Sequence, residues 1–278
     1  MEDLEIFVVG DGVPDETREL VAETGDPRIR FFDNPKGPRN GEIHRHAALA
    51  EARSGIVCYQ ADDDLWCREH VAELCDLLSA ADFAHNVALT VTPDGLVSPW
   101  LAVLESGVFR AHMLRGANFL PLSVVGHTID AYRSLPFGWR TTPPGIPTDL
   151  YMWQQFLVQP GIRLASGSRP SVFNFPTPAR RGWTLEERRS ELERWSEFLR
   201  SSRWSDDVEP ALSARCAAAT DRLRGRLRRL EPLAESARTR PLLGKAPRRL
   251  ATELWKHEVG DLRGRLLRGP VGSGVDDP

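Results

Sequence analysis

The chain has 278 residues, of which 41% are hydrophobic and 27% charged, and its formal net charge is −3 at pH 7. These values are typical of a folded protein with a sizeable core, and they exclude a disordered chain, a collagen-like fibre and a disulfide-stapled miniprotein. The cysteines form no Cys-x-x-Cys pair, so we expect reduced thiols rather than a cysteine metal site.

The start of the chain, Met1–Glu5, lacks the basic and then apolar order of a secretory signal. No apolar stretch approaches the ~20 residues that span a bilayer. We therefore expect a cytoplasmic protein without a membrane-spanning segment.

Short apolar runs alternate with helical patterns in the first sixty residues. The predicted elements are strands at 4–9, 28–32 and 56–59, a helix after Asp15 with Leu20 and Val21 turned inward, and a helix at 46–52. Strands that alternate with helices build parallel sheets through right-handed crossovers. The pattern therefore predicts an α/β fold with a mostly parallel, Rossmann-like sheet flanked by helices.

The later part of the chain is predicted to end in basic helices. The elements expected before them are a helix at 68–78, a turn at 92–95, a strand at 123–126, a helix at 149–157 and a capped helix from Thr184 to Arg200. From about residue 211 we expect helices that break near Pro232, Pro241 and Pro247. We divide the chain into an α/β domain at 1–180, a helical extension at 181–268 and a disordered tail at 269–278.

Charge is distributed unevenly along the chain. Residues 1–210 carry 21 basic and 31 acidic side chains, whereas residues 211–278 carry 15 and 8. An arginine-rich amphipathic helix can lie on anionic lipid, bind nucleic acid, or pack on the domain with a solvated basic face. No nucleic-acid motif accompanies the helices, so no nucleic acid is expected, and contact with a membrane surface stays open beside simple packing.

Three adjacent carboxylates, Asp62, Asp63 and Asp64, follow the third predicted strand. Their mutual repulsion is costly unless a cation or hydrogen-bond donors compensate for it. Hard oxygen ligands suit Mg²⁺ or Mn²⁺, which complete their shells with water and phosphate oxygens. The run therefore predicts a metal site for a substrate with a diphosphate, and the alternative is a solvated acidic turn.

Another carboxylate, Asp11, lies between Gly10 and Gly12 where the first predicted strand ends. An aspartate can accept hydrogen bonds from a nucleobase imide or a ribose hydroxyl, and glycine lets a ligand approach the backbone. Ligands of such sheets bind at the carboxyl ends of the strands. The repeated placement of aspartates there favours a ligand site, although each motif alone can be a plain turn.

These motifs resemble those of family 2 glycosyltransferases. Residues 4–17 are similar to the family's second strand, and the run Asp62–Trp66 resembles its Asp-x-Asp-type metal motif. The segment Gly126–Trp153 resembles the acceptor half, in which an aspartate opens a helix and serves as the base. The resemblance implies a GT-A-like fold that lacks its first strand before Leu4. That strand is then encoded upstream, supplied by another chain, or lost together with donor binding.

The resemblance implies a role for each matching residue. Asp11, Gly12 and Asp62 would bind the nucleotide sugar, Asp63 and Asp64 would hold the metal, and Asp149 would be the catalytic base. Thr148 stands where the family often has glutamate.

The activity implied is metal-dependent, inverting transfer of a sugar from a nucleotide sugar to a hydroxyl of a glycan, lipid carrier or small molecule. A carboxylate base activates the acceptor, and Mn²⁺ or Mg²⁺ neutralises charge on the departing nucleoside diphosphate. The alternatives are a noncatalytic binding or scaffold protein with the same fold and a nucleotidyltransferase.

Three other side chains have two interpretations each. His127 can contact an acceptor or a metal, or it can be a buried structural histidine. Trp153 can stack on an acceptor sugar or belong to the core. Arg180, with Arg181, can hold a diphosphate or lie on a solvated loop.

Overall fold

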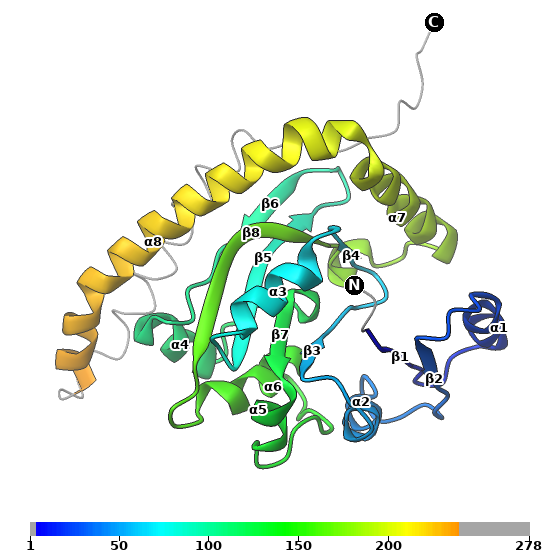
Figure 1. Cartoon of the computed structure of the whole chain (residues 1–278), viewed down its shortest axis with the longest axis horizontal. Helices are drawn as coiled ribbons and strands as arrows, with labels where there is room; N and C mark the ends of the chain where they lie inside the picture. The colour runs from blue at the N-terminus through cyan, green and yellow to red at the C-terminus, as the bar shows by residue number, and fades with distance from the viewer. Residues whose placement is uncertain (1–3, 239–278) are drawn as a thin grey trace, which may run out of the picture. The chain divides into compact units, whose positions relative to one another are not determined.

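The computed structural model (Figure 1) describes residues 4–238, with side chains up to residue 231. The chain forms two compact units: unit 1 comprises Met1–Val57 and His127–Ile162, and unit 2 comprises Cys58–Gly126 and Arg163–Pro278. The tail predicted at 269–278 and the breaks predicted at Pro241 and Pro247 lie outside the described residues.

Unit 1 begins with a strand–helix–strand arrangement, as the sequence predicted. β1 (Ile6–Val9) pairs in parallel with β2 (Ile29–Phe32), and α1 (Asp15–Glu23) connects them. The expectation that Leu20 turns inward is wrong, because Leu20 is 64% exposed. The pair β1 and β2 forms a sheet of only two strands, which offers α1 little apolar surface to cover.

The rest of unit 1 consists mainly of helices. α2 (Glu42–Ala50) starts before the helix predicted at 46–52, and Gly41 precedes it with φ 65°, a left-handed conformation that glycine adopts without strain. α5 (Ile129–Arg133) and α6 (Thr148–Leu157) follow later in the chain. The apolar face of α6, which includes Leu150 and Phe156, lies in the core.

β5 (Phe83–Val91) is the central strand of unit 2 and is buried along almost its whole length. It pairs antiparallel with β6 (Val97–Trp100) and in parallel with β8 (Leu164–Asn174), and β4 (Leu65–Trp66) pairs antiparallel with β8. The sequence did not predict β8, although it is the longest strand among the described residues. Two strands run across the unit boundaries: β3 (Ile56–Cys58) and β7 (Val125–Thr128).

Helices and helical turns accompany these strands in unit 2. They are α3 (His70–Leu78), α4 (Gly107–Leu114), the 3₁₀ turns Leu122–Val124 and Thr177–Arg180, α7 (Leu185–Arg200), the π-helical turn Arg203–Val208 and α8 (Glu209–Arg238). The predicted cap of α7 is confirmed, since Thr184 Oγ1 accepts from Glu187 N at 3.2 Å and Glu187 Oε2 accepts from Thr184 N at 2.6 Å.

The long helix α8 packs along β8 (Figure 1), and its apolar side chains Leu212, Leu223 and Leu227 are buried. It continues past Pro232, so the break predicted there is wrong. A proline removes one backbone hydrogen bond, and a long helix held by packing elsewhere tolerates that loss. No helix within residues 4–238 combines the length and apolarity needed to cross a membrane. The α/β class with a helical C-terminal part is confirmed.

Candidate active-site residues

The three adjacent aspartates lie in a turn between β3 and β4, within unit 2, and their side chains have different surroundings. Asp62 is exposed, the Asp63 side chain is 28% exposed, and Asp64 is only 3% exposed. Successive residues of a turn point in different directions, so one carboxylate enters the protein while its neighbours stay accessible.

Asp64 uses both carboxylate oxygens inside the protein. Its Oδ1 accepts from Asn174 Nδ2 at 2.9 Å and from Phe175 N at 3.1 Å, and its Oδ2 accepts from Ser123 Oγ at 2.6 Å. Burial raises the pKa of Asp64, the hydrogen bonds from Ser123 and Phe175 oppose this, and the nearby charge of Asp63 adds to the rise. Asp64 thereby ties the turn to the end of β8.

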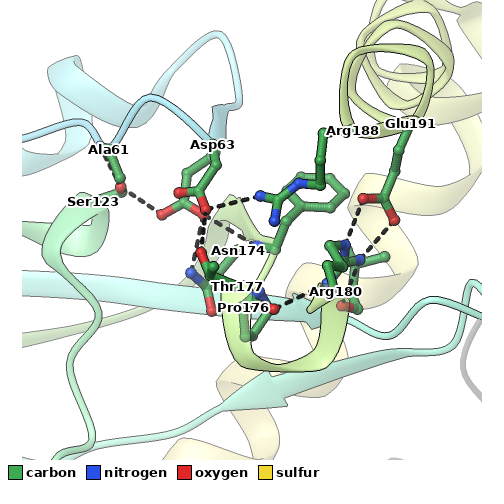
Figure 2. Close-up of polar contacts among 12 residues, drawn as sticks. Ala61, Asp63, Ser123, Asn174, Pro176, Thr177, Arg180, Arg188 and Glu191 are labelled. Carbon is green, nitrogen blue, oxygen red and sulfur yellow. Dashed lines mark hydrogen bonds and ion pairs between the residues drawn. The ribbon is translucent and has the colours of Figure 1, made fainter. Parts of the chain in front are cut away.

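Ser123 connects the same turn to a further part of unit 2. Its Oγ accepts from Ala61 N at 2.9 Å, as Figure 2 shows, and its carbonyl oxygen accepts from Trp66 Nε1 at 2.9 Å. The turn is therefore held at both of its ends as well as at Asp64.

Asp63 points toward a polar cluster from the later part of the chain (Figure 2). Its Oδ2 accepts from Thr177 Oγ1 at 2.9 Å and from Arg188 Nη2 at 2.9 Å. Thr177 begins the 3₁₀ turn after β8, and Arg188 lies in the first turns of α7. The guanidinium of Arg188 thus compensates the charge of Asp63.

The accessible carboxylates fit a cation that arrives with its own ligands. Asp62 and Asp63 supply hard oxygen ligands, and Mg²⁺ or Mn²⁺ binds through one or two carboxylates plus water and phosphate oxygens. Within residues 4–238, no group of three or more His, Cys, Asp or Glu side chains could form a closed metal cage. The donor set therefore suits a metal–diphosphate pair better than a metal held by protein alone.

Arg180 has neither of the two surroundings considered for it. It is buried and pairs with Glu191 of α7, with Nε–Oε2 at 2.5 Å and Nη2–Oε1 at 2.6 Å, and Nη2 also donates to the Val91 carbonyl at 3.1 Å (Figure 2). The Arg180 guanidinium lies 5.3 Å from the centre of the Phe175 ring. Both interpretations are wrong for Arg180, because it fastens α7 to the sheet, whereas Arg181 is exposed as the solvated-loop alternative expects.

Asp11 lies in unit 1 at the end of β1, as the sequence predicted. Its Oδ1 accepts from Gly37 N at 2.6 Å, its Oδ2 pairs with Lys36 Nζ, and His44 Nε2 is 3.5 Å from Oδ1. Burial raises the pKa of Asp11, but the hydrogen bonds from Lys36 and Gly37 outweigh it, so the pKa lies below its usual value. Asp11 therefore carries its negative charge at neutral pH.

Two glycines allow the chain to close around Asp11. A Cβ on Gly12, whose φ is 69°, would lie 2.7 Å from Lys36 Cβ, and a Cβ on Gly41 would lie 2.6 Å from Asp11 Cγ. Gly12 is thus needed for the close approach of Lys36. Packing within the protein therefore explains the glycine after Asp11 without a ligand.

Asp149 lies in the first turn of α6, in unit 1, and its Oδ1 accepts from Leu150 N at 2.8 Å. The residue before it, Thr148, donates from Oγ1 to Glu42 Oε1 at 3.2 Å. Glu42 is fully buried at the start of α2 and also accepts from Thr142 N at 3.3 Å. A glutamate distant in sequence therefore holds the segment that leads into Asp149.

His127 and Trp153 are completely buried in unit 1. The His127 ring stacks on Tyr132 with centres 5.5 Å apart, and burial lowers its pKa to about 4, so the ring is neutral at physiological pH. Trp153 meets Trp139 edge to face, with ring centres 5.8 Å apart. This burial favours the packing alternative over an acceptor or metal contact for both residues.

Four residues of these clusters carried no signal in the sequence. Glu42, Ser123, Thr177 and Arg188 contact their acidic or hydroxyl partners across long separations, such as the 125 residues between Arg188 and Asp63. Only the capping box before Arg188 marked a local feature, and it predicts a helix start rather than a partner for the arginine.

Comparison with known proteins finds a family match for the first part of the chain. Residues 1–128 match the family model described as glycosyl transferase family 2. No curated protein matches the chain. Among solved structures, residues 1–349 of S. aureus TarS are similar at 14% identity and a TM-score of 0.45, covering 93% of this chain and 72% of that one. The same segment with UDP-GlcNAc gives 14% identity and 0.45, covering 92% and 71%.

Proposed function

We propose that this chain is a glycosyltransferase of GT-A fold, because residues 1–128 match the family 2 model, and that its donor is a nucleotide sugar and its acceptor a hydroxyl group. The hydroxyl would belong to a glycan, a lipid carrier or a small molecule. The transfer would invert the anomeric centre and depend on Mn²⁺ or Mg²⁺. A bound divalent ion would neutralise charge that develops on the departing nucleoside diphosphate.

The observation that supports this proposal most is that the three aspartates differ in burial and in hydrogen-bond partners. Asp64 is held by hydrogen bonds from Ser123, Asn174 and Phe175, whereas Asp62 is exposed and Asp63 is partly exposed. An acidic turn that served only to cap a helix would not need three anchoring donors on one carboxylate. We assign Asp63 as the principal metal ligand and Asp62 as a ligand of the metal or the ribose. Asp64 anchors the turn that carries them.

Asp149 is the proposed base. It would remove the proton from the acceptor hydroxyl as the oxygen attacks the anomeric carbon, while the bond from that carbon to the diphosphate oxygen breaks on the opposite face. The pairing of Thr148 with Glu42 supports this role, because it fixes the start of α6, where Asp149 lies. Asp11 would accept a hydrogen bond from the nucleobase while Lys36 and Gly37 keep it ionised.

Incubation with a panel of nucleotide sugars and Mn²⁺, followed by detection of free nucleoside diphosphate, tests the proposal. We expect one donor to be turned over, and we expect Asp149→Asn to lower the rate about 10²–10⁴-fold, the usual contribution of a general base. Asp130→Asn, in the first turn of α5, is the matched control and should be unaffected. Full activity of Asp149→Asn would refute the base. Release of pyrophosphate instead would indicate a nucleotidyltransferase.

Dependence on metal is tested separately with a chelator. We expect EDTA to abolish transfer and Mn²⁺ or Mg²⁺ to restore it, and we expect Asp63→Asn to weaken metal binding. Asp76→Asn, on the exposed side of α3, is the control. Undiminished transfer in EDTA would refute the dependence on metal but not the proposed sugar transfer.

Contact of the basic helices with a membrane and a cytoplasmic location also remain proposals. Exposed arginines of α8, among them Arg215, Arg222 and Arg229, support an encounter with anionic lipid. Co-sedimentation of the full chain with vesicles of phosphatidylglycerol, compared with phosphatidylcholine, is the test. Equal recovery in both pellets would refute the electrostatic contact.

A further inference from the structure

Arg188 forms an ion pair with Asp63, the carboxylate that the proposed function assigns to the metal. Its Nη2 lies 2.9 Å from Asp63 Oδ2, and its side chain is 16% exposed. Arg188 lies outside residues 1–128, so the matched family region does not contain it. An ion pair that neutralises a metal ligand must be rearranged before a metal can bind there.

We propose that Arg188 exchanges partners: it neutralises Asp63 in the free protein and pairs with the donor's diphosphate when a divalent cation takes its place on Asp63. The inference rests on the proposed metal site at Asp63. It adds a residue of α7 to the groups that contact the donor.

Charge favours this exchange. A divalent cation and a guanidinium repel each other when both lie beside one carboxylate, so Arg188 must withdraw or gain an anion of its own. The diphosphate that accompanies the cation is such an anion, and the planar guanidinium binds phosphate oxygens through paired hydrogen bonds. When the sugar leaves, the diphosphate gains a further negative charge, which strengthens its attraction to Arg188.

The contacts of α7 hold the helix in place, so the proposed exchange needs only the Arg188 side chain to move. Glu191, one turn after Arg188, is fixed by its buried pair with Arg180, and the Trp195 ring packs 5.1 Å from Phe173 between centres. The capping box at Thr184 fixes the start of the same helix. Arginine has a long, flexible stem, so its guanidinium can change partner without displacing these anchors.

Thr177 has a different part in the exchange. Its hydroxyl donates to the same Asp63 oxygen but carries no charge, so it does not compete with a cation as Arg188 does. It can therefore continue to orient Asp63 after Arg188 has left.

Binding measurements on the full chain test the exchange without relying on catalysis. We would compare the wild type with Arg188→Gln and with Arg189→Gln, a control whose arginine pairs with Glu193 on the exposed side of α7. Mn²⁺ affinity would be measured first, from the electron paramagnetic resonance signal of free Mn²⁺. Affinity for UDP and for pyrophosphate, which needs no base-specific contact, would then be measured by calorimetry at saturating Mn²⁺.

We expect Arg188→Gln to bind Mn²⁺ about 3- to 10-fold more tightly, because it lacks the competing cation, and to bind UDP or pyrophosphate about 10-fold more weakly. Arg188→Lys keeps the charge without the paired donors, so its Mn²⁺ affinity should stay near wild type and its diphosphate affinity should fall. If Arg188→Gln does not fold, Arg188→Lys still tests the expected loss of diphosphate affinity.

Unchanged Mn²⁺ affinity in a folded Arg188→Gln protein, or diphosphate affinity equal to that of Arg189→Gln, would overturn the exchange. Failure of every variant and of the wild type to bind Mn²⁺ would overturn both the exchange and the metal site. Sugar transfer measured in EDTA would then show whether the glycosyltransferase proposal survives alone.

Discussion

Replacement of Asp64 and of Asp63 by asparagine should have opposite consequences for stability and for metal binding. Asp64 accepts from three largely buried donors, whereas Asp63 makes a partly exposed ion pair and one hydroxyl contact. We therefore expect Asp64→Asn mainly to lower the free energy of unfolding, and Asp63→Asn mainly to remove Mn²⁺ binding.

The magnitudes follow from the contacts. In Asp64→Asn the remaining Oδ1 can still accept from Asn174 and Phe175, but the new NH₂ group faces Ser123 Oγ. Ser123 already accepts from Ala61 N, and its second lone pair can accept from the new amide. The change should cost about 1–2 kcal/mol, whereas Asp64→Ala leaves three donors without an acceptor and should cost about 3–6 kcal/mol.

Asp63→Asn should lower the free energy of unfolding by about 1–2 kcal/mol, because the ion pair with Arg188 is only partly exposed and the asparagine oxygen can still accept from Thr177. Urea unfolding followed by tryptophan fluorescence measures stability, and electron paramagnetic resonance of free Mn²⁺ measures binding. The reasoning would be refuted if Asp64→Asn kept wild-type stability yet lost Mn²⁺ binding, since Asp64 would then be a ligand rather than an anchor.

Three other consequences can be measured on the same protein. Arg180→Met leaves Glu191 buried without its partner and should lower the free energy of unfolding by about 3–5 kcal/mol, while Arg180→Met with Glu191→Leu should recover much of it; equal losses in the single and double variants would contradict a buried pair. Glu42→Gln should lower the transfer rate more than the stability, because its contacts position the start of α6; steady-state kinetics that match wild type would exclude that role. The buried histidines 70, 85 and 127 have pKa values lowered by burial to about 4, so the unfolded chain binds more protons than the folded one between about pH 6.5 and pH 4. The free energy of unfolding should therefore be unaffected above that window and should fall inside it by at most about 4 kcal/mol per pH unit as the pH is lowered. His127→Phe should reduce this slope by about a third, and an unchanged slope in urea titrations would show that His127 is not a titrating group.

Local patterns in the sequence predicted many of the elements but not β8, the strand that pairs in parallel with β5. The strand–helix–strand start, the α7 cap and the helix that carries Asp149 all follow from runs of apolar residues and capping residues. β8 lacks such a pattern because Gly167 and Pro170 interrupt it. Gly167 is required by packing, since a Cβ there would lie 1.9 Å from Asn86 Oδ1.

The sequence predicted an acidic site but could not separate its members. Asp63 and Asp64 are neighbours of the same type, and only the direction of each side chain in the folded turn decides which one is buried. Their partners Asn174 and Arg188 lie 110 and 125 residues further along the chain. No pattern of periodicity reports such contacts, so the anchoring role of Asp64 and the pairing of Arg188 required the structure.

The long separation between Asp64 and its donors in β8 has a consequence for the order in which the protein is made. The aspartate turn leaves the ribosome well before Asn174 and Phe175, so its buried carboxylate lacks two of its three donors until about a hundred further residues have been synthesised. Contacts of such high sequence separation form late. A fragment of residues 1–128 would therefore leave the Asp64 carboxylate with one of its three donors, and a chimera that transplants the aspartate turn must carry the end of β8 with it.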